Sequence, residues 1–141
     1  MLAKIIKDQK DAALLITRIF VGIIFTAHGI NNFQVGINTI TSFFTAIGVP
    51  FSQFFSWIVT LFEIFGGLAL IFGAFSRFAA LILSIIMLVA IVKVKFSAGL
   101  IAPQALPGVG MEIDLALLAG LLSVLLQGPG RYSIELKLFK K

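Results

Sequence analysis

The sequence predicts an all-α integral membrane protein, a four-helix bundle that crosses the bilayer. The first observation is composition, since 60% of the 141 residues are hydrophobic and 12% are charged, with a mean hydropathy of +1.11. A soluble domain of this size cannot bury so much apolar surface. The second is that four segments are long and apolar enough to cross a hydrocarbon core of ~30 Å as helices. These segments leave no room for a soluble domain, so we expect residues 1–141 to form one transmembrane domain.

The predicted membrane spans are approximately residues 12–30, 54–73, 78–94 and 113–127. The first span follows three lysines and therefore also resembles the beginning of a secretory signal peptide. Against that interpretation, Arg18 interrupts the apolar run, and no small-x-small cleavage pattern follows it. We therefore interpret this segment as a membrane-spanning helix.

Most of the positive charge lies on one side of the predicted membrane. Nine of the eleven basic residues fall on the side of the two termini: Lys4, Lys7, Lys10, Arg18, Arg77, Arg131, Lys137, Lys140 and Lys141. The loops 31–53 and 97–111 on the other side contain no Lys or Arg. The positive-inside rule therefore predicts that both termini are cytoplasmic. Because topology explains the net charge of +5, we expect contact with the lipid bilayer and no nucleic-acid partner.

The connections between the spans differ in length. Residues 74–77 are a short connection, so the second and third spans are expected to form an antiparallel helical hairpin. Residues 37–47, in the first outer loop, place Ile and Phe on one face of a helix and Asn, Thr and Ser between them. This pattern predicts a short amphipathic helix, lying on the outer surface or dipping in as a lid, that ends at Gly48 and Pro50. The second outer loop, 97–111, is too rich in Pro and Gly to form a fifth span.

Glu63 is an acid in the middle of the second span. An unpaired charge there costs at least ~2.5–3.5 kcal/mol, so we expect Glu63 to face the bundle interior and to be paired, hydrated or protonated. Small residues share a helical face with this acid and with the arginine of the first span: Gly66 and Gly67 with Glu63, and Gly22 and Gly29 with Arg18. Such faces let helices approach closely, and Arg18 is the expected partner of Glu63. The pair either takes part in chemistry or is only a structural lock between helices.

A second group of polar side chains lies near the predicted outer ends of the spans. It comprises His28 and Asn32 at the end of the first span, Lys93 and Lys95 at the end of the third, and Glu112 and Asp114 at the start of the fourth. These groups predict an outer vestibule. The alternative is an ordinary cluster of helix ends, because acids suit a helix N-terminus and lysines snorkel toward water.

The fourth span repeats the combination of an acid with small residues, at Glu112, Ala116, Ala119 and Ser123. We therefore expect all four helices to converge on an axis of polar atoms that runs from Arg18 through Glu63 to His28 and Glu112. Fifteen Phe residues fill the remainder as packing, and aromatic walls would also suit a flat ring ligand.

The chain contains no Cys and a single His. Disulfides, thiolate metal sites and thiol redox chemistry are therefore excluded within this chain. A haem held by two histidines of one protomer is excluded as well. We expect neither haem nor metal to be bound by this chain alone.

Four stretches resemble the DoxX family of small bacterial and archaeal membrane proteins: RIFVGIIFTAHGINNF, AIGVP, FEIFGGLALIFGAFSRFAAL and GMEIDLALLAGLLSVLLQGPGRYSIE. The resemblance covers about residues 14–135. The family pattern corresponds here to Arg18, His28, Gly29, Gly48, Pro50, Glu63, Gly66, Gly67, Gly73, Arg77, Glu112, Gly128, Pro129 and Gly130. Two positions depart from it, because this chain has Asn32 and Lys95 where relatives often have Lys and His.

The resemblance implies a four-helix membrane protein whose relatives include subunits of quinone-linked oxidoreductases, such as thiosulfate:quinone oxidoreductases. The main hypothesis is a redox subunit in a prokaryotic plasma membrane that binds a quinone inside the bundle. Its candidate catalytic residues are Glu63, His28 and Arg18, and its candidate cofactor-binding residues are Asn32, Lys95 and Glu112. Because the chain has no evident electron carrier, this hypothesis requires a redox partner subunit.

Two other functions remain open. The first is a non-enzymatic membrane scaffold or assembly factor, in which a buried ion pair is purely architectural. The second is a small-molecule or proton carrier, since intramembrane acids often mark such paths. One four-helix protomer offers little room for alternating access, so a carrier would need to form a homo-oligomer.

Overall fold

The computed structural model describes residues 2–101 and 110–139, and for residues 2–8 and 139 it describes the backbone alone. The described elements are all helical: α1 (Leu2–Val35), α2 (Ile37–Ala46), α3 (Ser52–Phe72), α4 (Ser76–Ala90), the π-helical turn η1 (Ile91–Lys95), the short 3-10 turn η2 (Phe96–Ala98), α5 (Glu112–Gln127) and α6 (Ile134–Phe139). The predicted all-α class is therefore confirmed for this part of the chain. Most of the second outer loop lies outside the described residues.

Among the described residues, three helical stretches are long and apolar enough to cross a membrane: Gln9–Val35, Ser52–Phe72 and Ser76–Ala98. They correspond to the first three predicted spans. The helix at the fourth predicted span, α5, has 16 residues and reaches only ~24 Å at 1.5 Å per residue. A fourth crossing therefore stays a prediction, as does the orientation of the termini.

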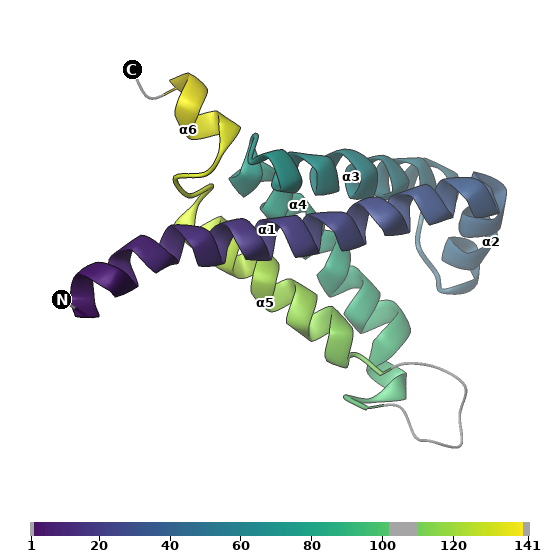
Figure 1. Ribbon diagram of the computed structural model, residues 1–141. Coiled ribbons are helices and arrows are strands. Elements are labelled where there is room, and N and C mark those ends of the chain that lie inside the picture. Colours follow the sequence, from purple (N-terminus) through teal and green to yellow (C-terminus); the bar gives the residue numbers. More distant parts are fainter. Residues whose placement is uncertain (1, 102–109, 140–141) are drawn as a thin grey trace.

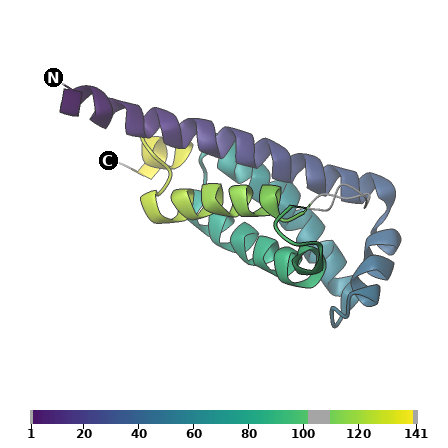
Figure 2. The same ribbon diagram turned by 90° about the horizontal axis from the view of Figure 1, so that it is seen from below.

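The four long helices pack around a common core. The most extensive contact joins α1 and α3, α4 packs on α5 and α3, and α5 also packs on α1. The α1/α3 pair and the α4/α5 pair cross at an angle, and both ends of the chain lie at the same end of the molecule (Figures 1 and 2). The core is a single cluster of apolar side chains: Val21, Phe25, Leu70, Ala79, Ala80, Leu83, Met87, Ile91, Leu117, Leu121 and Val124.

Glycines set the close approach of α1 and α3. A Cβ added to Gly22 would lie 2.6 Å from the carbonyl oxygen of Gly67, and one added to Gly29 would lie 2.9 Å from that of Thr60. No side chain fits at such distances, so the two backbones are in direct contact, as small residues allow in membrane helices. The prediction that these faces serve close helix contact is confirmed.

The predicted short amphipathic helix is α2. It begins after Gly36 and ends just before Gly48, whose φ angles of 100° and 72° favour glycine. The helix packs on α3 and, less extensively, on α1. Its polar side chains at Asn38, Thr39, Ser42 and Thr45 are exposed, whereas Ile40 and Phe44 are partly buried.

One predicted helix face is wrong. Ala116 and Ala119 of α5 are exposed, and the buried residues of α5 are instead Leu117, Leu121 and Val124. The larger apolar side chains fill the space against the core, while Ala116 and Ala119 point outward. Oε2 of Glu112 is buried, but the two alanines of the predicted face do not join an interior polar axis.

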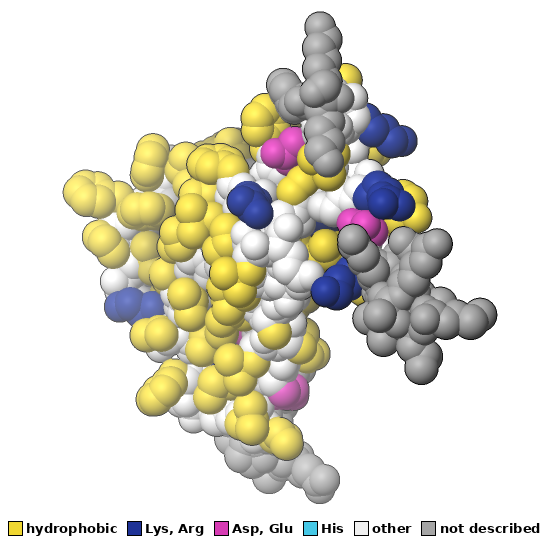
Figure 3. Space-filling model, turned by 90° about the vertical axis from the view of Figure 1, so that its left-hand side faces the viewer, with side chains coloured by type: hydrophobic (Ala, Val, Ile, Leu, Met, Phe, Trp, Pro, Cys, Tyr) yellow, Lys and Arg dark blue, Asp and Glu magenta, His cyan; other side chains and the backbone are white. Residues whose placement is uncertain are grey.

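Large aromatic side chains cover the outside of the helices. Phe20, Phe65 and Phe78 are 64%, 63% and 58% exposed, which water would disfavour and a lipid bilayer would not. Figure 3 views the molecule from the end that holds the termini, and hydrophobic side chains cover one side of this face while most Lys and Arg in view lie on the other. The surface thus agrees with a protein embedded in lipid.

Candidate functional site

A cavity of about 590 Å³ lies where α1, α2, α3, α4 and η1 meet. Its apolar lining comprises Ile40, Phe43, Phe44, Ile47, Val49, Pro50, Phe55, Ile58, Val59, Phe62, Ile82, Ile85, Ile86, Val89, Ala90 and Val94. The polar side chains among the described lining residues are His28, Asn32, Glu63 and Lys93. Size and lining agree with small-molecule sites, which are mostly apolar hollows of ~300–1,000 Å³ with a few placed polar groups.

The polar wall of the cavity is built by α1 and α3. His28 and Asn32 are four residues apart on α1, so they share one face of the helix. The contact of Gly29 with Thr60 presses this turn against α3. As a result, the amide Nδ2 of Asn32 donates a hydrogen bond of 2.7 Å to Oε2 of Glu63. The acid is only 9% exposed, so it faces the interior as predicted.

The predicted partner of Glu63 is wrong, because Arg18 lies near the opposite end of α3. Its guanidinium donates to the carbonyl oxygens of Leu70 at 3.3 Å and Tyr132 at 2.9 Å. Leu70 is seven residues beyond Glu63, which is ~10 Å along a helix. The C-terminal end of α3 is the negative end of the helix dipole and attracts a cation. The Leu70 carbonyl therefore accepts from Arg18 in addition to the backbone N–H of Gly73.

The surroundings of Arg18 form a second polar cluster, which we call the Arg18 end. Arg18 is fully buried, and the missing side chain of Gly73 leaves room for Nη1. The carboxylate of Glu135 interacts electrostatically with Arg18, and its Oε2 accepts a hydrogen bond of 3.3 Å from the backbone N–H of Ser76. The backbone N–H of Glu135 donates to the Gly73 carbonyl at 3.1 Å. This end therefore ties the C-terminal segment to α1, α3 and α4.

The predicted outer vestibule is only partly assembled. His28, Asn32 and Lys93 line the cavity together with Glu63, whereas Lys95 and Glu112 are not among its described lining residues. Glu112 lies in the first turn of α5, where its backbone N–H donates to the Leu100 carbonyl at 3.1 Å. Sequence reasoning missed the part of α4 that lines the cavity, although Ile82, Ile86 and Val89 recur at helical spacing.

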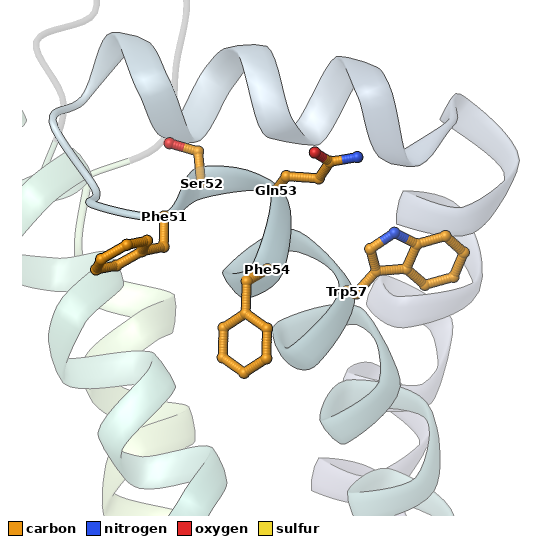
Figure 4. Close-up of a pocket in the computed structure, with 5 residues that line it drawn as sticks. All are labelled: Phe51, Ser52, Gln53, Phe54 and Trp57. Carbon is orange, nitrogen blue, oxygen red and sulfur yellow. The ribbon is translucent and has the colours of Figure 1, made fainter.

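A shallower hollow of about 560 Å³ lies at the beginning of α3 and is lined by Phe51, Ser52, Gln53, Phe54 and Trp57. Figure 4 shows that its three aromatic rings do not surround a common centre. Phe51 is 81% exposed, and Trp57 packs edge-on against Phe33 with ring centroids 6.3 Å apart. Such aromatic side chains suit the interface between membrane and water, so the cavity beside Glu63 is the candidate site.

Comparison with known proteins identifies the relatives of this chain. It is 32% identical over 146 aligned residues, 98% of this chain and 88% of the other, to the "Uncharacterized membrane protein Rv3486" of Mycobacterium tuberculosis. It is also 32% identical over 88 residues, 62% of this chain and 63% of the other, to the "Putative oxidoreductase CatD" of Bacillus subtilis. No solved structure matches significantly.

The profile of the DoxX family matches residues 13–96, which include most of α1, all of α2, α3 and α4, and the residues that line the cavity between them. The chain is therefore a membrane protein and belongs to the DoxX family.

Proposed function

We propose that the protein is a subunit of a quinone-linked oxidoreductase, and that the cavity beside Asn32 and Glu63 holds the quinone head group. The observation that carries the proposal is a buried acid, held by an amide, in the wall of an otherwise apolar cavity of about 590 Å³. The name of the CatD relative supports a redox role. The proposed location is the plasma membrane of a prokaryote, with α5 as the fourth crossing of a four-helix bundle and both termini in the cytoplasm.

The residues present fit a quinone. Its flat apolar ring requires apolar and aromatic walls, which Phe44, Phe55 and Phe62 help to form. A quinone supplies two-electron chemistry coupled to the uptake of two protons at its carbonyl oxygens. The cavity accordingly needs hydrogen-bond donors and a group that exchanges protons on one wall, and Asn32 and Glu63 lie together there.

Each polar residue has a distinct part in this proposal. One N–H of the Asn32 amide binds Glu63, and the second N–H is available to a carbonyl oxygen in the cavity. Glu63 holds or releases a proton at the wall of a mostly apolar cavity. His28 lines the same cavity and offers a second donor or acceptor. Arg18 has no part in this chemistry because it lies at the other end of α3.

The electrons must come from a partner subunit. The chain has no Cys and one His, so it cannot supply a cysteine-bound iron–sulfur cluster or a haem with two histidine ligands from one protomer.

Binding of a lipid-soluble quinone such as menaquinone to the detergent-purified protein tests the proposal. We expect Glu63→Gln and His28→Ala to bind at least ~10-fold more weakly, a loss of about 1.4 kcal/mol, while both variants elute as folded protein. Glu112→Gln is the matched control, because Glu112 is an acid outside the described lining, and it should bind as the wild type does. Equal binding by all four proteins would overturn the proposal.

A second candidate function is a membrane scaffold or assembly factor. The Arg18 end favours it, because the fully buried arginine there binds main-chain carbonyls and is not among the described lining residues of the cavity beside Glu63. This candidate gains support if mild solubilisation recovers a stoichiometric partner and no quinone. The carrier function has no comparable observation in its favour.

A further inference from the structure

The helix α2 forms a roof over the cavity and is fastened on one side. Ile40, Phe43 and Phe44 on its inner face line the cavity. The hydroxyl of Thr41 lies 3.1 Å from that of Ser56 on α3, to which it donates a hydrogen bond. Ser56 is fully buried, so the contact holds the roof closely against α3. The attachment of α2 to Ser56 closes the cavity on the side of α3, and the polar side chains of α2 face away from the cavity.

The opposite side of the roof, toward α4, is less closed. Both α2 and α4 pack on α3, but they are not among the helix pairs that pack extensively on each other. Three large apolar side chains that line the cavity from these two helices are also about half exposed: Phe43 at 45%, Ile85 at 50% and Val89 at 48%. Each of them therefore borders both the cavity and the outside of the molecule.

The outside at this place is the lipid. Ile85 and Val89 belong to the stretch Ser76–Ala98, which is long and apolar enough to cross a membrane. A ligand that passes between α2 and α4 would thus meet apolar side chains first and Glu63 last. Lys93 lies one helical turn beyond Val89 on the same cavity face and is exposed, so an ammonium group marks the end of the apolar opening.

We propose that the cavity opens sideways into the bilayer between α2 and α4, and that its ligand carries a long apolar tail that leaves through this opening. The head group lies beside Asn32 and Glu63, and the tail crosses Phe43, Ile85 and Val89 into the lipid. The identity of the head group rests on the proposed function. The opening adds the requirement that the quinone is a tailed, lipid-soluble one.

Two quinones with the same head group test the proposal: menadione, which has no tail, and menaquinone, which has an isoprenoid tail. Val89→Trp narrows the opening, and Leu88→Trp is the matched control because Leu88 is equally exposed, at 48%, and is not among the described lining residues. We expect Val89→Trp to weaken menaquinone binding at least ~10-fold and to leave menadione binding nearly unchanged. Leu88→Trp should alter neither. Similar menaquinone binding by the two variants, or equal loss of both quinones in Val89→Trp, would overturn the sideways opening.

Cysteine labelling covers the case in which the tryptophan variants do not fold. The chain has no native Cys, so Val89→Cys and Leu88→Cys each carry one thiol. We expect menaquinone to slow the reaction of a membrane-soluble maleimide with Cys in the Val89 variant several-fold and to leave the Leu88 variant unaffected. Absence of protection in both variants, while menaquinone binds, would also count against the opening.

The same measurements separate this proposal from the proposed function. If Glu63→Gln binds menaquinone as the wild type does, the head group is not held beside Glu63 and the proposed function fails. If Glu63→Gln loses both quinones while Val89→Trp matches Leu88→Trp, only the sideways opening fails. If the wild type binds neither quinone, both proposals fail.

Discussion

The two polar ends of the α1/α3 pair use buried charge in different ways. At the Arg18 end, the guanidinium is fully buried, donates to two main-chain carbonyls, and lies outside the described lining of the cavity beside Glu63. At the α2 end, Glu63 has one described hydrogen-bond partner, Asn32, and the rest of its surroundings is the wall of a cavity. The Arg18 guanidinium, which binds main-chain carbonyls and interacts with Glu135, stabilises the fold, whereas Glu63 lies beside a cavity where a ligand can reach it.

The largest expected loss of stability comes from a substitution that pushes α1 and α3 apart and so disturbs both polar ends of the pair. In Gly22→Leu, the new side chain would begin 2.6 Å from the Gly67 carbonyl oxygen and 2.7 Å from the Ile71 side chain. Because backbone cannot yield cheaply, we expect the free energy of unfolding to fall by more than about 4 kcal/mol. Thermal denaturation in detergent measures it. Ala27→Leu, at an exposed position of the same helix, is the control, and equal melting of the two variants would show that α1 and α3 do not meet through Gly22.

The register of α1 against α3 explains why the predicted pair of Arg18 and Glu63 was wrong. In an antiparallel pair, residue numbers rise along one helix as they fall along the other. Gly22 contacts Gly67, and seven residues further along α1, Gly29 contacts Thr60. The same register places Arg18 opposite Ile71, next to Leu70, and Glu63 opposite Thr26, so Arg18 and the position that faces Glu63 are eight residues apart on α1. The error arose because depth was counted from span boundaries, and α1 begins ten residues before the span that hydropathy predicts.

The remaining elements differ in how far the sequence predicts them. The amphipathic helix α2 was predictable because its apolar and polar residues alternate with helical period. The buried face of α5 was not, since Leu, Ala and Val surround that helix on all sides and give it little periodicity. The cavity depends on the angle at which the two helix pairs cross, which is a property of packing and not of any one segment.

A smaller effect is expected at the Arg18 end alone. Arg18→Ala removes two charged hydrogen bonds and leaves the Leu70 and Tyr132 carbonyls without this donor, so the free energy of unfolding should fall by about 3–4 kcal/mol. Limited proteolysis should also cut the segment around Tyr132 sooner. The control is Arg131→Ala, whose side chain is 71% exposed and 3.8 Å from Asp11, where an ion pair contributes ~0–1 kcal/mol. Equal effects of the two substitutions would contradict the role of Arg18 as a buried lock.

The smallest effect on stability is expected at the α2 end, where function should respond more than folding. Asn32→Ala removes the donor of the 2.7 Å hydrogen bond to Glu63, but the cavity beside the acid admits water, which can replace the amide. The free energy of unfolding should therefore fall by only ~1–2 kcal/mol, while menaquinone binding weakens at least ~10-fold. Asn31→Ala is the matched control, because Asn31 is the exposed neighbour and does not line the cavity. If Asn32→Ala lost as much stability as Arg18→Ala and still bound quinone normally, the contact of Asn32 with Glu63 would be structural, as the contacts of Arg18 are.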